Sequence, residues 1–84
     1  QVKMMTGTEA EVIEYNVPEN ARITSGPLKL IDFPKDAIVG GGIRNYKSYI
    51  ATGDTLIQAN DKVVVFALPT AFDKLNRFFN SEKH

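Results

Sequence analysis

The stretch that decides the fold is residues 37–68, AIVGGGIRNYKSYIATGDTLIQANDKVVVFAL. Residues 37–44 predict a strand, and residues 47–51 predict a second strand that returns beside it. Asn45 and Tyr46 form the two-residue turn between them, because Asn tolerates the positive φ that such tight turns require. We therefore predict a β-hairpin at the centre of the domain.

A loop and a third strand complete this stretch. Residues 52–61 contain two turn signals, Gly-Asp and Asn-Asp, and Leu56 and Ile57 between them are expected to point into the core. The run KVVVFAL at 62–68 is nearly continuous in apolar residues, which is typical of a strand buried on both faces. We therefore expect the Phe66→Ala substitution to destabilise the domain by about 3–5 kcal/mol.

Three consecutive glycines at residues 40–42 lie inside the first strand of the hairpin. Glycine weakens a strand interior, so the run indicates a bulge, a sharp bend or the close approach of another backbone. The alternative is a phosphate-binding loop. A dinucleotide fingerprint needs G-x-G-x-x-G between a strand and a helix, with an acidic residue about 20 positions later. Because a second strand follows these glycines, the pattern favours the bent strand.

The segment before this stretch adds another strand. In residues 10–17, Ile13, Tyr15 and Val17 alternate with polar neighbours, the pattern of a half-buried strand. Pro18 ends it, because proline cannot donate a hydrogen bond to a strand ladder.

The segment after it predicts one helix over residues 69–79. Phe72, Leu75, Phe78 and Phe79 recur at helical spacing and form a single apolar stripe. The sequence therefore predicts an α+β fold, with a small mixed or antiparallel sheet of about four strands and a C-terminal helix packed on it.

The length of 84 residues suits one domain with one core. We interpret residues 1–9 as the tail of a preceding domain or an expression remnant, residues 10–79 as the folded domain, and residues 80–84 as a polar tail. Because the chain begins with Gln, we expect the natural protein to be longer.

The composition argues against several functions. Ten basic and ten acidic residues lack the surplus of Lys and Arg that nucleic-acid binding requires. The absence of cysteine excludes disulfides and thiolate zinc sites. No apolar run approaches the roughly 20 residues that span a bilayer, so direct membrane insertion is not expected. The only histidine is the terminal His84, which leaves Ser25 and Ser48 without an activating base; we propose no catalytic residue and no enzyme activity.

The hairpin tip carries the best candidates for contact with a ligand. Arg44, Asn45 and Tyr46 place a guanidinium fork beside an aromatic ring, a combination suited to planar or anionic groups. The alternative is a solvated turn with Tyr46 packed at a dimer interface. If the ligand interpretation holds, Arg44→Ala should abolish a ligand-induced thermal shift and leave a dimer intact.

Four aspartates raise the question of a cation site: Asp32, Asp36, Asp54 and Asp61. A calcium loop needs ligands at alternate positions within about twelve residues and a bidentate Glu at its end. That spacing is missing, so we propose no metal site. Asp54 and Asp61 fit better as turn residues that bind nearby backbone amides.

A spaced order of apolar and turn residues runs through most of the chain: Phe33-Pro34, Ala37-Ile38-Val39, Ile43-Arg44, Ile50, Gly53-Asp54-Thr55, Asp61 and Val63-Val64-Val65-Phe66. This order resembles the C-terminal domain of RCK (regulator of potassium conductance) proteins, in particular of TrkA-type regulatory subunits of bacterial potassium uptake systems. The likeness covers about residues 10–79. The family often has proline where Ala51 stands and glycine where Asn60 stands; neither change threatens the fold.

The resemblance implies a regulatory domain that forms a homodimer and follows a Rossmann-like domain of the same chain. That preceding domain would bind NAD or another nucleotide, whereas no cofactor is expected in this fragment. The parent protein would act in the cytoplasm, at the inner face of the membrane, through a potassium transporter subunit. In some family members a small ligand binds in the dimer cleft. The alternative is a purely structural dimerisation module, with sensing done by the absent nucleotide-binding domain.

Overall fold

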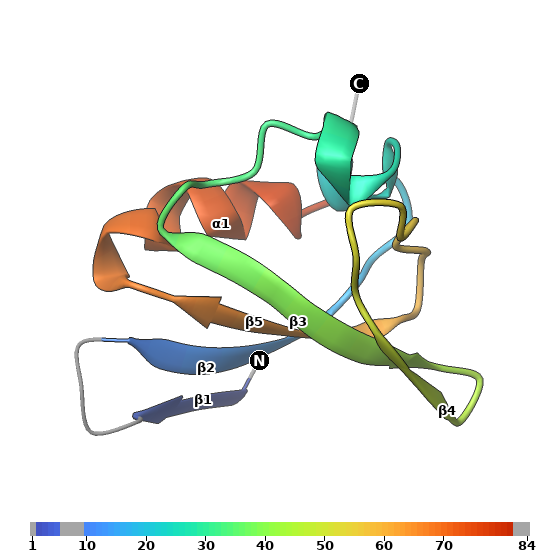
Figure 1. The fold of residues 1–84 in the computed structure, drawn as a ribbon, viewed down its shortest axis with the longest axis horizontal. Coiled ribbons are helices and arrows are strands. Elements are labelled where there is room, and N and C mark those ends of the chain that lie inside the picture. Colours follow the sequence, from blue (N-terminus) through green and yellow to red (C-terminus); the bar gives the residue numbers. More distant parts are fainter. Residues whose placement is uncertain (1, 6–9, 82–84) are drawn as a thin grey trace.

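The computed structural model describes residues 2–5 and 10–81, which form one antiparallel sheet with a short helix on one face (Figure 1). The strand order is β1-β2-β5-β3-β4. This arrangement confirms the predicted α+β fold class. The elements are β1 Val2–Met5, β2 Glu11–Asn16, β3 Ala37–Arg44, β4 Lys47–Ile50, β5 Lys62–Ala67 and α1 Phe72–Phe78.

Strand β1 is an addition to the predicted sheet. It comes from the segment that the sequence suggested as a tail, and it pairs antiparallel with β2 from Val2 opposite Glu14 to Met5 opposite Glu11. Residues 1 and 6–9 lie outside the described part of the chain. The predicted polar tail is described only as far as Ser81, so His84 also lies outside it.

The hairpin of β3 and β4 forms as predicted, with Asn45 and Tyr46 as its two-residue turn. Their φ values of 51° and 67° are both positive, which is the signature of a type I′ turn and matches the right-handed twist of the strands.

The glycine run is a bulge in a closely packed strand. The register of β3 against β5 shifts between Val39 and Gly41, which leaves Gly40 as the extra residue. A Cβ on Gly41 would collide with the Tyr49 carbonyl oxygen, and one on Gly42 would stand 2.5 Å from the Lys62 carbonyl oxygen. Two neighbouring backbones therefore require these glycines, as the bent-strand interpretation proposed.

The core lies on one face of the sheet. Alternate residues of β2, β5 and β3 point to this face, where α1 and its Leu75 and Phe78 cover them. Tyr15 stacks on Phe79 with ring centroids 4.0 Å apart. Two 3₁₀ turns, Arg22–Thr24 and Leu28–Leu30, lie on the same side as the helix (Figure 1).

Strand β5 differs from its prediction. Its burial alternates: Val63 and Val65 are fully buried, whereas Phe66 on the other face is 45% exposed. The prediction of burial on both faces was wrong, because no helix or loop of the described chain covers the second face. Of the two loop residues expected to point inward, Ile57 is fully buried and Leu56 is 44% exposed.

None of the helices in the described residues is long and apolar enough to cross a membrane.

Candidate functional site

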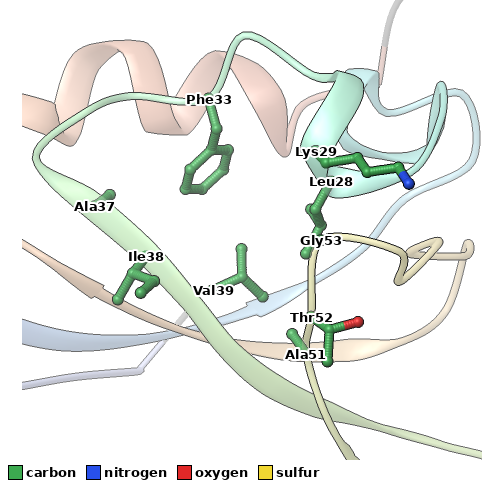
Figure 2. A pocket seen from close by; sticks show the side chains of 9 residues that line it. All are labelled: Leu28, Lys29, Phe33, Ala37, Ile38, Val39, Ala51, Thr52 and Gly53. Carbon is green, nitrogen blue, oxygen red and sulfur yellow. The ribbon is translucent and has the colours of Figure 1, made fainter.

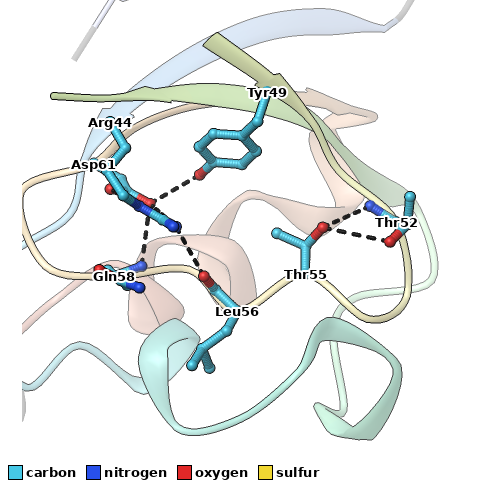
Figure 3. Close-up of polar contacts among 7 residues, drawn as sticks. All are labelled: Arg44, Tyr49, Thr52, Thr55, Leu56, Gln58 and Asp61. Atoms are coloured by element: carbon cyan, nitrogen blue, oxygen red, sulfur yellow. Dashed lines mark hydrogen bonds and ion pairs between the residues drawn. The ribbon is translucent and has the colours of Figure 1, made fainter. Parts of the chain in front are cut away.

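A buried carboxylate organises the end of the sheet beneath the hairpin tip. The Asp61 side chain is only 1% exposed. Arg44 donates to it from two nitrogens, Nε to Oδ1 at 2.9 Å and Nη2 to Oδ2 at 2.8 Å. The Tyr49 hydroxyl donates to Oδ2 at 2.9 Å, and the Gln58 backbone N–H donates at 3.1 Å (Figure 3). The paired fork satisfies a charge that would be costly to bury alone.

These contacts shift the pKa values of the Asp61 carboxyl group and the Tyr49 hydroxyl group. Burial by itself would raise the pKa of Asp61, but the hydrogen bonds from Arg44, Gln58 and Tyr49 and the charge of Arg44 hold it below its usual value. Burial and the hydrogen bond to Asp61 raise the pKa of Tyr49 to about 12. Asp61 is therefore ionised and Tyr49 neutral at physiological pH.

The structure places the three predicted ligand contacts in two different environments. Arg44 lies under the tip, where its fork holds Asp61 and its Nη2 also donates to the Leu56 carbonyl oxygen at 2.9 Å. Asn45 and Tyr46 form the exposed turn. The Tyr46 side chain is fully exposed, at 103% of the accessible area of an isolated reference tyrosine. The guanidinium therefore joins β3 to the loop before β5, and the ligand role of these residues stays a prediction.

The aspartates lie apart from one another and have separate partners. Asp32 pairs with Lys74 at 3.3 Å, Asp54 pairs with Lys29 at 2.6 Å, and Asp36 accepts from the Thr70 hydroxyl at 2.7 Å. As predicted for a turn residue, Asp61 accepts from a nearby backbone amide. Within the described residues, no group of three His, Cys, Asp or Glu side chains gathers that could hold a metal ion.

An apolar pocket lies at the opposite end of β3 from the tip (Figure 2). Its volume is about 300 Å³, at the lower limit of small-molecule sites. Three segments border it: residues 28–33, which begin with the turn at Leu28–Leu30, the start of β3, and the chain that follows β4. The lining residues are Leu28, Lys29, Phe33, Ala37, Ile38, Val39, Ala51, Thr52 and Gly53.

Backbone hydrogen bonds preform this pocket. The Leu28 N–H donates to the Thr55 carbonyl at 3.0 Å, and the Lys29 N–H donates to the Gly53 carbonyl at 2.8 Å. These bonds join the turn at Leu28–Leu30 to the chain that follows β4. Thr52 and Thr55 fix the turn between them, with the Thr52 N–H 2.8 Å from the Thr55 hydroxyl (Figure 3). A ligand would therefore meet a formed cavity and would not have to order a loop.

The pocket suits a largely apolar group, because most of its lining side chains are apolar. Strand β4 pairs with β3 only over Gly41–Arg44, so residues 37–39 border the pocket on the side where a further strand would pair. A ligand edge with hydrogen-bonding groups can bind such a strand edge as a short strand would. In Figure 2 the Lys29 ammonium points away from Val39, and it is paired with Asp54. A ligand in the pocket therefore needs no anionic group to neutralise this charge.

Sequence reasoning placed the candidate site at the hairpin tip, which is at the other end of β3 from this pocket. Leu28, Phe33 and Ala51 were recognisable as apolar residues, but nothing in their spacing indicates that they enclose one cavity. The usable signal was the short second strand of the hairpin: because β4 ends early, the start of β3 pairs with β5 on one side and has no strand on the other.

Comparison with known proteins agrees with this fold. The chain is 34% identical over 73 residues to "Trk system potassium uptake protein TrkA homolog 1" of Methanosarcina mazei, which covers 87% of this chain and 16% of that protein. It is 30% identical over 79 residues to a "Trk system potassium uptake protein TrkA homolog" of Archaeoglobus fulgidus, covering 94% of this chain and 18% of that protein. The chain thus spans less than a fifth of the length of these relatives.

The chain also matches a solved structure in its fold and a protein-family pattern in its sequence. A structure described as "Structure of RCK domain with cda" superposes with a TM-score of 0.66 at 23% identity, over 82% of this chain and 97% of that one. This likeness shows a shared fold. The sequence pattern of the TrkA-C domain matches residues 12–80. The chain therefore belongs to the TrkA-C domain family.

Proposed function

We propose that this chain is a non-enzymatic regulatory domain of a TrkA-type potassium uptake protein. The observation that carries the proposal is the family match over residues 12–80, together with relatives that are named as Trk system potassium uptake proteins. The rest of such a protein would include a Rossmann-like domain that binds NAD or another nucleotide. The whole would act at the cytoplasmic side of the membrane, on a potassium transporter subunit.

Within that protein, the domain forms a homodimer and senses a small ligand. Support for a ligand comes from the preformed apolar pocket, whose wall includes the start of β3, where β4 no longer pairs with it. Bound ligand biases the angle between the two protomers, and the preceding domain transmits that change to the transporter. The ligand shifts this equilibrium only by the difference between its affinities for the two arrangements.

A thermal-shift screen of this fragment tests the sensing role. The probes are nucleotides, cyclic dinucleotides and metal ions at millimolar concentration, because a ligand that binds only the folded state raises the unfolding temperature. A binder from this screen supports a sensor. The absence of any shift would instead favour the purely structural dimerisation module.

Two variants then distinguish the pocket from the hairpin tip. Ala51→Leu narrows the pocket, while Tyr46→Ala removes the exposed ring of the tip. A pocket ligand loses its thermal shift in the first variant and keeps it in the second; a tip ligand shows the reverse. Arg44→Ala is less suitable, because the loss of its bonds to Asp61 perturbs the fold itself.

The regulatory role is tested in the full-length parent protein. Potassium uptake is measured in cells that depend on it, with the intact protein and with Ala51→Leu. We expect Ala51→Leu to retain folded protein and to lose the response of uptake to the ligand found in the screen. Uptake that responds equally in both proteins would contradict regulation through this pocket.

A further inference from the structure

Residues 51–61 connect β4 to β5 and form one wall of the pocket; we call this segment the strap. Its first three residues, 51–53, line the pocket. Within the strap, which the structure describes completely, two side chains are buried, Ile57 at 0% and Asp61 at 1% exposure. The part beside the pocket, residues 51–56, therefore has no buried side chain of its own to anchor it.

Hydrogen bonds hold residues 51–56 in place at both ends. On the pocket side, the N–H groups of Leu28 and Lys29 donate to carbonyl groups of the strap. On the other side, the Arg44 Nη2 donates both to the Leu56 carbonyl oxygen at 2.9 Å and to Asp61 Oδ2 at 2.8 Å (Figure 3). We call these contacts of Arg44 the latch. Neither Arg44 nor Asp61 lines the pocket.

We propose that Arg44 and Asp61 are positioning residues for the pocket, because the latch holds the strap against the turn at Leu28–Leu30 and so keeps the pocket wall formed. Without the guanidinium, the Leu56 carbonyl loses its donor and the buried carboxylate loses its charged partner. Residues 51–56 then keep surface hydrogen bonds and the exposed ion pair of the strap with Lys29, which stabilises little. The strap can then open locally, at a lower free energy than global unfolding.

The inference rests on the proposed function and deepens it, because it assigns control of the ligand pocket to residues outside the pocket. A formed pocket binds more tightly than one that the ligand must first order. By thermodynamic linkage, a ligand in the pocket and the latch stabilise each other by the same free energy. The hairpin tip and the pocket at the other end of β3 are therefore coupled through the strap, and a group that draws the Arg44 guanidinium away loosens the pocket.

Hydrogen exchange of single amides, followed by NMR without any ligand, tests the latch. The reporters are the N–H groups of Leu28 and Lys29, whose acceptors belong to the strap. The variant is Arg44→Lys, because an ammonium keeps the charge but does not supply the fork that binds both carboxylate oxygens. We expect the two reporters to exchange about tenfold faster or more, and by a larger factor than the amides of the central strand β5.

Ile13→Val is the matched control. It removes one methylene from a buried position of β2, so it destabilises the fold globally without touching the strap. We expect it to accelerate the amides of β5 and to leave the reporters at Leu28 and Lys29 at their original rates. Reporters that keep their rates in Arg44→Lys would overturn the proposal. So would reporters that accelerate by the same factor as β5 in both variants, because that is the effect of a general loss of stability.

A disulfide across the strap provides a rescue experiment. The chain contains no cysteine, and a Cβ on Gly53 would lie 3.2 Å from the Lys29 Cβ, close to the spacing of about 3.5–4.5 Å in disulfides. Lys29→Cys with Gly53→Cys therefore allows a bond that holds the strap closed without the latch. With this disulfide formed, Arg44→Lys should no longer accelerate exchange of the Leu28 amide, and reduction should restore the acceleration. Acceleration that persists in the oxidised form would overturn the proposal.

The outcomes separate the latch from the sensing role, because neither exchange experiment uses a ligand. Exchange rates that do not respond to Arg44→Lys contradict the latch and leave the ligand sensor standing. A thermal-shift screen without a binder contradicts the sensor, whereas the exchange rates of the reporters still show whether the latch holds the strap.

Discussion

At the scale of single residues, Asp61 is a buried carboxylate that accepts four hydrogen bonds. It is buried to 1% exposure, yet it belongs to an Asn-Asp turn that has the appearance of an ordinary surface loop. The cost of burying its charge is offset by Arg44, Tyr49 and the Gln58 N–H. Arg44, which the sequence suggested for ligand contact, thus has a structural role that pattern alone did not reveal.

Replacing this carboxylate should destabilise the fold. Asp61→Asn removes the charge that Arg44 binds through two nitrogens, and we expect a loss of about 2 kcal/mol in the free energy of unfolding. Breaking a fully buried ion pair costs about 3–5 kcal/mol. We expect a smaller loss here, because the Arg44 side chain is 33% exposed and water hydrates its charge once the carboxylate is gone. Urea unfolding followed by circular dichroism measures the loss. Asp54→Asn is the control, since its pair with Lys29 is exposed, and an equal loss there would contradict the assignment.

The same carboxylate predicts a dependence of stability on pH. Its pKa is below the usual value of the unfolded chain, about 3.9. The stabilisation is therefore complete above the unfolded pKa and disappears as pH falls through the folded one. Between neutral pH and pH about 3, the unmodified chain should lose more free energy of unfolding than Asp61→Asn. Parallel losses in the two proteins would show that other carboxylates cause the acid sensitivity.

At the scale of elements, most strands and the helix were predictable from the sequence, but the layers that cover them were not. The hairpin followed from Asn45 and Tyr46, and the helix stripe from Leu75 and Phe78, because each signal is local to the chain. The extra strand β1 was missed because its segment has no alternating pattern. The exposure of Phe66 was missed because an apolar run does not tell whether one or two layers cover a strand.

The glycine run offers a test at this scale. Gly41→Ala introduces a Cβ that collides with the Tyr49 carbonyl, so β3 and β4 must separate, and we expect a cost of about 1–3 kcal/mol. Gly26 has no atom within 4 Å of such a Cβ, so Gly26→Ala should leave stability unchanged or raise it slightly. Urea unfolding gives both values, and amide exchange in β4 should accelerate only in Gly41→Ala. Equal stability of both variants would refute the close packing.

At the scale of the whole molecule, the candidate surfaces arise from parts that are distant in sequence. The pocket combines residues 28–33, the start of β3 and the chain after β4. The sheet face opposite α1 combines strands whose order is not their order in the chain. Sequence patterns place residues on faces of single elements, but they do not say which faces meet. For this reason the family was predictable from the residues, whereas the pocket required the structure.

The uncovered face of the sheet also predicts how much its aromatic side chain stabilises the fold. Phe66→Ala should cost only about 1 kcal/mol, because the ring on this face is 45% exposed. Phe78→Ala, at a fully buried position, should cost about 3–5 kcal/mol.

Urea unfolding of the two variants measures both costs. Phe66→Ala should shift the unfolding midpoint much less than Phe78→Ala, since the Phe78 side chain lies in the core that α1 covers. If Phe66→Ala lowers stability as much as Phe78→Ala, the Phe66 ring is covered within the folded domain, and the uncovered face of the sheet is contradicted.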